Sequence, residues 1–372
     1  MFVLISKRLP PTRCGIGDYS FNLAGALAAH GARVAGLAWE RPPSAAPVDH
    51  TFPVHYLAEA SASSLATALH KFAQTAQEPL QAILQTSQYD AHPRALASWL
   101  TRGLEQSRTQ GIIQSWIVML HEIWLPELAR RRDVWIYPWQ RAAFAGLTRA
   151  ADAVAVTCET YARRVKCLAP SVRPTVLPVF SNFAEPAIET ALAANRDAGA
   201  WAVFGSTSRI RTGLKSLLDD PPTKCLREQI ACLEVFGGEP DAAVSTILSG
   251  HRNLSQRYQP AIPAAEAGQR LQACHAAWID YPESQADATL LGKSTLLAAA
   301  IANGALPVMA YPATGFFANG EPLPCWFSTE NPPPPADSSA AQSARAANLS
   351  WYHRHAARTI HAQWCEKALR AN

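Results

Sequence analysis

The chain has 372 residues, of which 48% are hydrophobic and 17% are charged, so it is long enough to form two globular domains. Its formal net charge of +4 is small, and the basic excess lies in the first half. The sequence shows no interleaving of aromatic and basic residues, so we expect no nucleic-acid partner. A basic first half is compatible with peripheral contact with an anionic membrane surface, and a solvated helix face is the alternative.

The cysteine pattern and the lengths of the apolar runs indicate where in the cell the protein is expected. The eight cysteines form no Cys-x-x-Cys pair and no zinc-type cluster with histidine. We therefore expect free thiols, no bound metal and a cytoplasmic protein. The apolar run at residues 1–6 is too short for a signal peptide. No stretch approaches the roughly 20 apolar residues that span a bilayer.

In the first half, short apolar runs that predict strands alternate with segments whose apolar residues have helical spacing. Residues 1–6 predict a strand, a Pro/Gly-rich loop follows, and residues 19–31 have helical spacing that ends at Gly31. A strand over 32–39 completes a βαβ unit. Further buried strands are predicted at 80–87, 112–124 and 151–157, the last followed by a helix.

The second half begins after a polar, Ala-rich stretch at 184–200, which we interpret as a linker. A strand over 201–204 then enters a Gly/Ser turn. Later elements are a helix or strand at 228–239, a strand at 274–283, a helix at 294–304 and a strand at 305–311. Residues 331–348 read as an exposed tether, and 349–372 as one amphipathic helix. The expected domains are therefore 1–183, 184–348 and the final helix 349–372.

Residues 292–295, Gly-Lys-Ser-Thr, look like part of an ATP-binding phosphate loop. That loop needs a glycine five positions before the Gly-Lys pair, and Asp287 occupies this place. We therefore reject an ATPase. A helix that starts with Lys293, Ser294 and Thr295 still favours an anion. A Ser cap with a solvated Lys is the alternative.

The order of these motifs resembles the retaining GT-B glycosyltransferases, in particular family 4. The resemblance rests on residues 14–27, 120–124, 151–165, 203–218 and 280–309. It implies an α/β fold of two Rossmann-like, doubly wound domains that face each other across a cleft, with a C-terminal helix that crosses back to the first domain. It implies a hexosyltransferase-like enzyme that uses a UDP- or GDP-sugar, retains the anomeric configuration, and needs no metal or other cofactor. The implied acceptor is a glycan or a lipid-linked molecule at the inner face of the membrane.

The resemblance also places candidate residues. The glycine-rich turn, for the diphosphate or the acceptor, contains Gly15, Ile16, Gly17, Asp18 and Tyr19; a plain tight turn and a capping Asp18 are the alternatives. His121 and Glu122, at the end of a buried strand, are the candidate catalytic residues. Those predicted to bind the donor are Ser206, Arg209, Arg211, Lys215, Glu283, Lys293, Ser294 and Thr295. The sequence does not decide between the two arginines.

One departure from the family opens a second interpretation. Many members carry two glutamates eight positions apart where this chain has Leu291 and Ala299. Neither side chain can ionise, so an acid would have to come from Glu283 or Asp287. The alternative is a non-catalytic GT-B protein that binds a nucleotide, a glycan or a partner. A nucleotide-sugar epimerase or dehydrogenase is disfavoured because the turn lacks the third glycine of its fingerprint.

Overall fold

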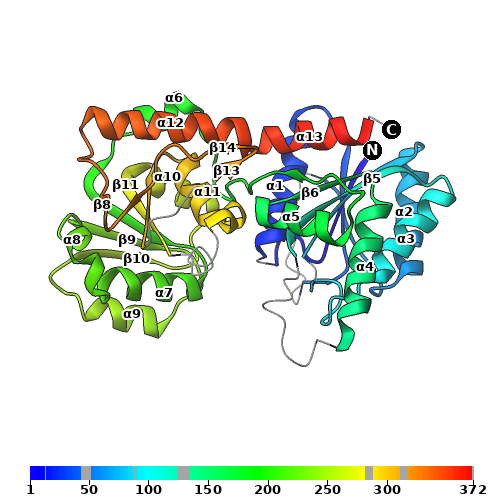
Figure 1. The fold of residues 1–372 in the computed structure, drawn as a ribbon, viewed down its shortest axis with the longest axis horizontal. Helices are drawn as coiled ribbons and strands as arrows, with labels where there is room; N and C mark the ends of the chain where they lie inside the picture. The colour runs from blue at the N-terminus through cyan, green and yellow to red at the C-terminus, as the bar shows by residue number, and fades with distance from the viewer. Residues whose placement is uncertain are drawn as a thin grey trace. The chain divides into compact units, whose positions relative to one another are not determined.

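The computed structural model describes residues 1–12, 14–42, 52–87, 89–123, 135–280, 288–310 and 317–370. The chain forms two compact units, each built around one parallel sheet (Figure 1). Unit 1 contains Met1–Pro178 and Arg358–Asn372, and unit 2 contains Val179–Ala357.

The sheet of unit 1 has the strand order β3-β2-β1-β4-β5-β6-β7, and every pair is parallel. Its strands are β1 (Phe2–Ser6), β2 (Val34–Ala38), β3 (Val54–Tyr56), β4 (Leu80–Ser87), β5 (Ile113–Glu122), β6 (Ala153–Val156) and β7 (Thr175–Val176). Its helices are α1 (Gly15–Ala29), α2 (Ala62–Ala76), α3 (Ser98–Thr109), α4 (Tyr137–Ala150), α5 (Glu159–Leu168) and α13 (Arg358–Arg370).

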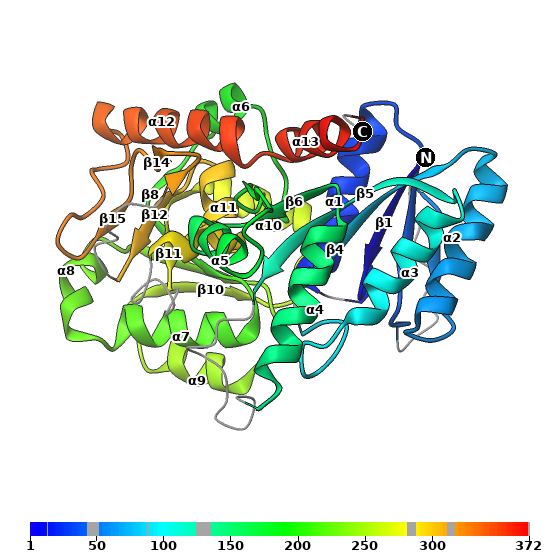
Figure 2. The ribbon, with the colours of Figure 1, turned by 45° about the vertical axis from the view of Figure 1, so that its right-hand side comes forward.

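Helices cover both faces of this sheet. Helices α1 and α13 lie on one face and α2, α3 and α4 on the other (Figures 1 and 2). The central strands are therefore continuous apolar runs; all five residues of β1 are buried. The direction in which strands are added reverses between β1 and β4, and such a switch point is where ligands of these sheets bind.

Unit 2 repeats this plan with the strand order β10-β9-β8-β11-β12-β15, and a small β13-β14 pair lies apart. Its strands are β8 (Asp197–Phe204), β9 (Cys232–Phe236), β10 (Ser255–Gln259), β11 (Cys274–Ile279), β12 (Leu306–Met309), β13 (Phe317–Ala318), β14 (Glu321–Pro322) and β15 (Phe327–Ser328). Its helices are α6 (Ile188–Ala193), α7 (Thr207–Leu218), α8 (Lys224–Arg227), α9 (Ala242–Ser249), α10 (Ala264–Ala273), α11 (Thr295–Ala302) and α12 (Ser339–His355), with 3-10 turns η3 (Pro221–Thr223) and η5 (Ala288–Lys293).

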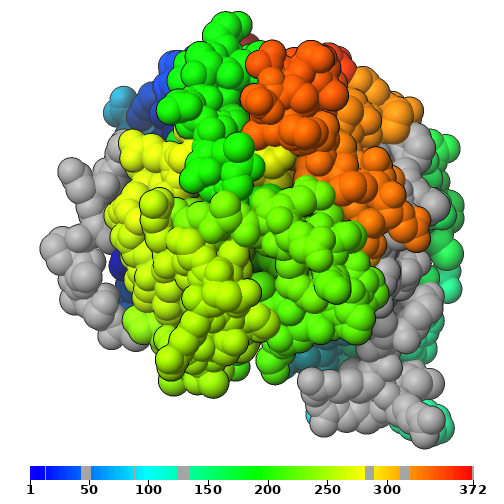
Figure 3. Space-filling model, turned by 90° about the vertical axis from the view of Figure 1, so that its left-hand side faces the viewer, coloured from blue at the N-terminus to red at the C-terminus, as the bar shows by residue number. Residues whose placement is uncertain are grey.

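The two faces of the second sheet are covered by different helices. Helices α7, α8 and α9 lie on one face, and α10, α11 and α12 on the other (Figures 1 and 2). Helices α6 and α12 lie side by side at the surface of the unit (Figure 3). The switch point of this sheet lies between β8 and β11. The α/β fold class with two doubly wound sheets is thus confirmed.

Three segments differ from the sequence-based predictions. The supposed linker at 184–200 contains α6 and the first residues of β8. The supposed tether at 331–348 contains most of α12, whose start is capped by the Ser338 hydroxyl. Ala341 and Ala344 of that helix are buried in the core of unit 2. Small side chains allow such close packing, and this is why an Ala/Ser-rich composition was mistaken for an exposed segment.

The C-terminal region is two helices rather than one. Helix α12 ends at His355 and α13 begins at Arg358. Helix α12 packs within unit 2, and α13 packs on α1 and β5 of unit 1. In the described parts of the chain, no helix is long and apolar enough to cross a membrane.

Candidate functional site

In unit 1, the start of α1 meets the end of β1 at the switch point. The helix begins at Gly15, so the glycines predicted to form a loop belong to its first turn. Its N-cap residue, Cys14, makes no side-chain capping hydrogen bond. An uncapped helix start presents backbone N–H groups and the positive end of the helix dipole, a combination that suits an anion.

The two glycines of this turn have different surroundings. A Cβ on Gly17 would lie 2.7 Å from the backbone oxygen of Arg8, so only glycine fits. A Cβ on Gly15 would meet no atom within 4 Å. The backbone of Arg8 therefore requires a glycine at position 17, whereas no described atom lies where a Gly15 side chain would be. Asp18 lies in the first turn of α1 rather than at its N-cap position, and its N–H donates to the Cys14 carbonyl at 2.8 Å.

His121 and Tyr19, predicted separately, lie together in the structure. His121 is the penultimate residue of β5 and is 7% exposed. The ring of Tyr19 from α1 packs on it edge-to-face, with the centroids 4.5 Å apart. Burial lowers the pKa of His121 to about 3, so its imidazole is neutral at physiological pH. The neighbouring Glu122 is exposed.

Two residues missed in the sequence analysis complete this cluster. Gln85 of β4 accepts a hydrogen bond from His121 Nε2 at 2.7 Å. His361 of α13 accepts a hydrogen bond from the Tyr19 hydroxyl at Nδ1, and its Nε2–H donates to the Pro178 carbonyl at 3.0 Å. Because a carbonyl only accepts, this bond fixes the tautomer of His361. Gln85 lies within a predicted buried strand, and a polar residue in such a strand could have indicated a functional role. Nothing in the sequence pointed to His361, because its partners are distant along the chain.

In unit 2, two glycine-rich turns meet at the ends of β8 and β9, next to the switch point. Gly205, at the end of β8, has φ of +125°, and the next turn contains Gly237 and Gly238 with φ of +97° and +62°. A Cβ on Gly237 would lie 2.7 Å from the Gly205 oxygen. The backbones therefore touch, and the Glu239 N–H donates to Thr207 Oγ1 at 2.8 Å. This contact fixes the start of α7.

Helix α7 begins at this junction with Ser206 as its N-cap residue, and no side chain caps it. The three predicted cations divide between two sides of α7: Arg209 lies on one side, and Arg211 and Lys215 lie on the other. Positions 209 and 211 are about 160° apart around a helix of 3.6 residues per turn, whereas 211 and 215 differ by only about 40°. Arg211 is paired with Asp241 of the α9 N-cap at 2.9 Å. Lys215 is exposed in the last turn, about 12 Å from the start of the helix at 1.5 Å per residue. Arg209 is therefore the cation that faces the strand ends.

Asp280 is a further candidate that the sequence analysis did not single out. It follows β11 directly and is half-buried. Burial raises the pKa of Asp280, while the neighbouring hydroxyls of Thr212 and Ser216 of α7 and the positive charge of Arg209 oppose the rise. The signal in the sequence was an acid immediately after the buried run 274–279, at the place where ligands of parallel sheets lie.

The Gly-Lys-Ser-Thr segment forms the end of η5 and the start of α11. Ser294 is the N-cap residue: it is 2% exposed, and its Oγ accepts from the Leu297 N–H at 3.2 Å. The capping alternative is thus correct for Ser294. Lys293 and Thr295 are half-buried on either side of it. Glu283 and Asp287 lie outside the described residues.

The two positions where related enzymes carry glutamates belong to the interior. Leu291 is 1% exposed and Ala299 is 2% exposed. Neither side chain has a polar group, so neither position can supply an acid at the switch point. An acid that contacts a donor sugar in this unit has to come from another position, and Asp280 is one described carboxylate at the strand ends.

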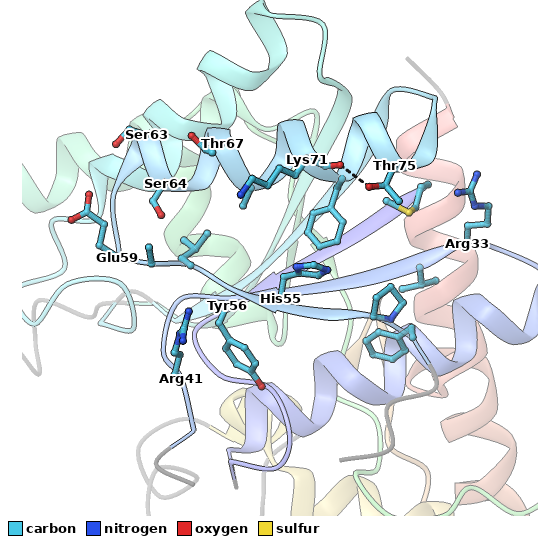
Figure 4. Close-up of a pocket in the computed structure, with 18 of the residues that line it drawn as sticks. Arg33, Arg41, His55, Tyr56, Glu59, Ser63, Ser64, Thr67, Lys71 and Thr75 are labelled. Atoms are coloured by element: carbon cyan, nitrogen blue, oxygen red, sulfur yellow. Dashed lines mark hydrogen bonds between the residues drawn. The ribbon is translucent and has the colours of Figure 1, made fainter. Parts of the chain in front are cut away.

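A groove of about 960 Å³ runs along the edge strand β3 in unit 1. Figure 4 shows Ser63, Thr67 and Lys71 of α2 on one side and His55 and Tyr56 of β3 on the other. None of the predicted site residues lines it. The groove follows the sheet edge rather than the switch point, so it is a separate feature.

No protein-family model and no curated protein matches the sequence. Solved structures match over the whole chain. An α-glucosyltransferase in complex with UDP and a 13-mer DNA containing a HMU base is 14% identical, with 99% of this chain and 98% of that chain covered and a TM-score of 0.60. An α,α-trehalose-phosphate synthase (UDP-forming) from Burkholderia vietnamiensis is 10% identical over 100% and 99%, with a TM-score of 0.55. WaaG, a glycosyltransferase involved in lipopolysaccharide biosynthesis, is 12% identical over 100% of both chains, with a TM-score of 0.51.

These similar structures are GT-B glycosyltransferases, and the chain has the GT-B fold. One expectation from the sequence has to be corrected. The α-glucosyltransferase of similar fold was solved in complex with DNA, so the exclusion of a nucleic-acid partner was wrong. The exclusion relied on missing aromatic and basic patterning, and that pattern does not exclude a nucleic-acid partner for a chain of this fold.

Proposed function

We propose that the protein transfers a sugar from a nucleoside-diphosphate sugar to an acceptor, with the donor bound by unit 2 and the acceptor by unit 1. The observation that carries this proposal is the start of α7. It lies at the switch point of unit 2, has no side-chain cap, and carries Arg209 on the side of the strand ends. A helix N-terminus together with a guanidinium complements a diphosphate.

The chemistry requires such groups. When the bond between sugar and diphosphate breaks, negative charge develops on the leaving diphosphate and positive charge on the sugar. Fixed dipoles and cations stabilise the former without reorganising during the reaction. Arg209, the α7 amides and Lys293 are the donor-binding groups in this proposal, and they perform the role without a metal ion. EDTA is accordingly expected to leave the rate unchanged.

The finer assignments rest on the resemblance described above. We propose a family 4-like hexosyltransferase that uses a UDP- or GDP-sugar, retains the anomeric configuration and acts on a glycan or lipid-linked acceptor. The protein would work in the cytoplasm, with peripheral contact at the membrane through basic residues of unit 1. His121 and Tyr19 would belong to the acceptor-binding site of unit 1, together with the start of α1 at Gly15.

A second candidate is a GT-B protein that binds a nucleotide or glycan without turnover. The buried, apolar Leu291 and Ala299 favour it, because the acids of active relatives are replaced by core residues. The two candidates share a nucleotide-binding unit 2 and differ in catalysis. Release of free nucleoside diphosphate from a nucleotide sugar separates them.

The test measures nucleoside-diphosphate release from a panel of UDP- and GDP-sugars, and binding of the products by calorimetry. Arg209→Ala is expected to weaken binding of the diphosphate by about 1–3 kcal/mol, or about 5- to 150-fold, because a charge-assisted contact is lost. Arg211→Ala is the matched control, since Arg211 is paired with Asp241 on the other side of the same helix. Equal effects of both variants would refute the role of Arg209; binding without release would support the second candidate.

A further inference from the structure

The groove in unit 1 follows a strand that ends its sheet. β3 is paired with β2 on one side and is the last strand of the order on the other. The carbonyl of Pro53 and the N–H of Leu57 both bond to β2, each at 2.8 Å. In a parallel pair the residues that bond one neighbour alternate along the strand, so positions 53, 55 and 57 face β2. The backbone N–H and C=O groups of Val54 and Tyr56 therefore face away from the sheet, along its open edge.

Cations lie on both sides of this edge. Figure 4 shows Lys71 reaching in from α2 and Arg41 on the opposite side of β3 in that view. Both are exposed, and neither forms an ion pair in the described parts of the chain. Arg33 also lines the groove, and its guanidinium lies 3.4 Å from Glu78. Glu59 is the one carboxylate among the lining residues that the structure describes, so the groove favours an anionic ligand.

The wall formed by α2 is polar. Ser63, Thr67 and Lys71 are spaced by four residues and therefore form one stripe along the helix, and all three line the groove. The wall formed by β3 is held by the ring of His55, which packs edge-to-face on Phe72 with the centroids 4.7 Å apart. Hydroxyl and ammonium groups on the helix side suit acidic and hydroxyl-bearing side chains.

An extended peptide is the ligand that matches both the charge and the open edge. Its main chain carries N–H and C=O groups at the repeat of a β-strand, so it bonds the donors and the acceptors of an edge strand together. Phosphates of a nucleic acid only accept hydrogen bonds, and they would leave the outward carbonyls of β3 without a donor. A second copy of this chain, docked groove to groove, would bring Lys71 and Arg41 close to their own equivalents, and like charges oppose that contact.

We propose that the groove beside β3 binds an acidic, extended segment of a partner protein, which joins the sheet of unit 1 as a further strand. The main chain of the segment bonds Val54 and Tyr56, and its carboxylates contact Lys71 and Arg41. The site lies within unit 1, and two strands separate it from the switch point. The inference goes beyond the proposed transfer reaction and does not depend on it.

A labelled synthetic peptide tests the charge and the position of this site. The probe is a fluorescein-labelled hexapeptide that alternates glutamate with threonine, a residue that favours strands, and its binding to the whole wild-type chain is followed by fluorescence anisotropy. We expect saturable binding that weakens with added salt, and none by the matched lysine–threonine peptide. Lys71→Glu is expected to weaken binding about fivefold or more, because repulsion replaces attraction. Lys166→Glu, an equally exposed lysine of α5 outside the groove, is the control and should leave binding unchanged.

Amide hydrogen exchange, followed residue by residue by NMR, tests the pairing with β3. The bound glutamate peptide is expected to slow exchange of the Val54 and Tyr56 amides about tenfold or more, with little change at His55, which already faces β2. Equal protection of all three amides, or of none, would overturn the strand addition. No binding of the glutamate peptide, equal binding of the lysine peptide, or equal effects of the two lysine variants would overturn the proposed site. Displacement of the peptide by a thymidine hexanucleotide at lower concentration than by unlabelled peptide would assign the groove to nucleic acid instead.

Discussion

Arg209 and Arg211 are two residues apart in sequence and have different environments. The ion pair with Asp241 engages Arg211, while Arg209 lies on the side of Asp280. The sequence predicted a cationic stretch at the correct turn but could not choose between them, because the choice depends on which face of α7 packs on β11. In the same way, Ser294 was predicted as either ligand or cap, and only the geometry of Leu297 N–H identifies the cap.

The burial of the Asp280 carboxyl can be tested through the pH dependence of stability. Burial raises its pKa above the ordinary aspartate value of 3.8, so the folded state keeps the proton to higher pH than the unfolded state. Its contribution to stability therefore decreases as the pH rises from about 3.8 through the folded pKa, and is constant above that. Asp280→Asn removes this decrease and keeps a polar side chain of the same size beside Thr212 and Ser216. We expect the melting temperature of the variant relative to wild type to rise across this pH window; a constant difference would contradict the assignment.

Helix α1 and its glycines show what can be predicted for an element. The sequence predicts strand, turn and helix in the right order, because buried runs and helical spacing are local properties. It places the start of α1 late, at Tyr19 instead of Gly15, because glycine is a poor helix former and reads as loop. The long α12 was missed for a related reason: its Ala-rich face is apolar only where it meets the core of unit 2.

The two glycines of α1 give a matched pair for stability. Gly17→Ala places a Cβ 2.7 Å from the Arg8 oxygen, and we expect a loss of about 1–3 kcal/mol in unfolding free energy. Gly15→Ala meets no atom, and the better helix propensity of alanine should keep the change within about 1 kcal/mol, in the stabilising direction. Denaturant unfolding of both variants checks the pair. Similar losses for both would show that the approach of α1 to Arg8 is looser than described.

At the scale of the whole molecule, the α/β class and the doubly wound sheets follow from the alternation of buried strands and helices. The polar network of Tyr19, His121, Gln85 and His361 does not, because it joins residues up to 342 positions apart. The same limit applies to partners: the likeness to a DNA-bound α-glucosyltransferase lies in the fold at 14% identity, beyond the reach of charge patterning. The switch point of each sheet, however, can be located once the strand order is known. Candidate residues lie at the switch point of each unit.

The central claim is that unit 2 binds a nucleoside diphosphate through the start of α7. The most direct measurement is the melting temperature of the wild-type chain and of Arg209→Ala with UDP, GDP, ADP and CMP, because a ligand of the native state raises apparent stability by mass action. We predict that UDP or GDP raises the melting temperature of the wild type in a concentration-dependent manner, and that the shift is reduced in Arg209→Ala but not in Arg211→Ala. No shift with any nucleotide, or an equal shift in both variants, would contradict the account.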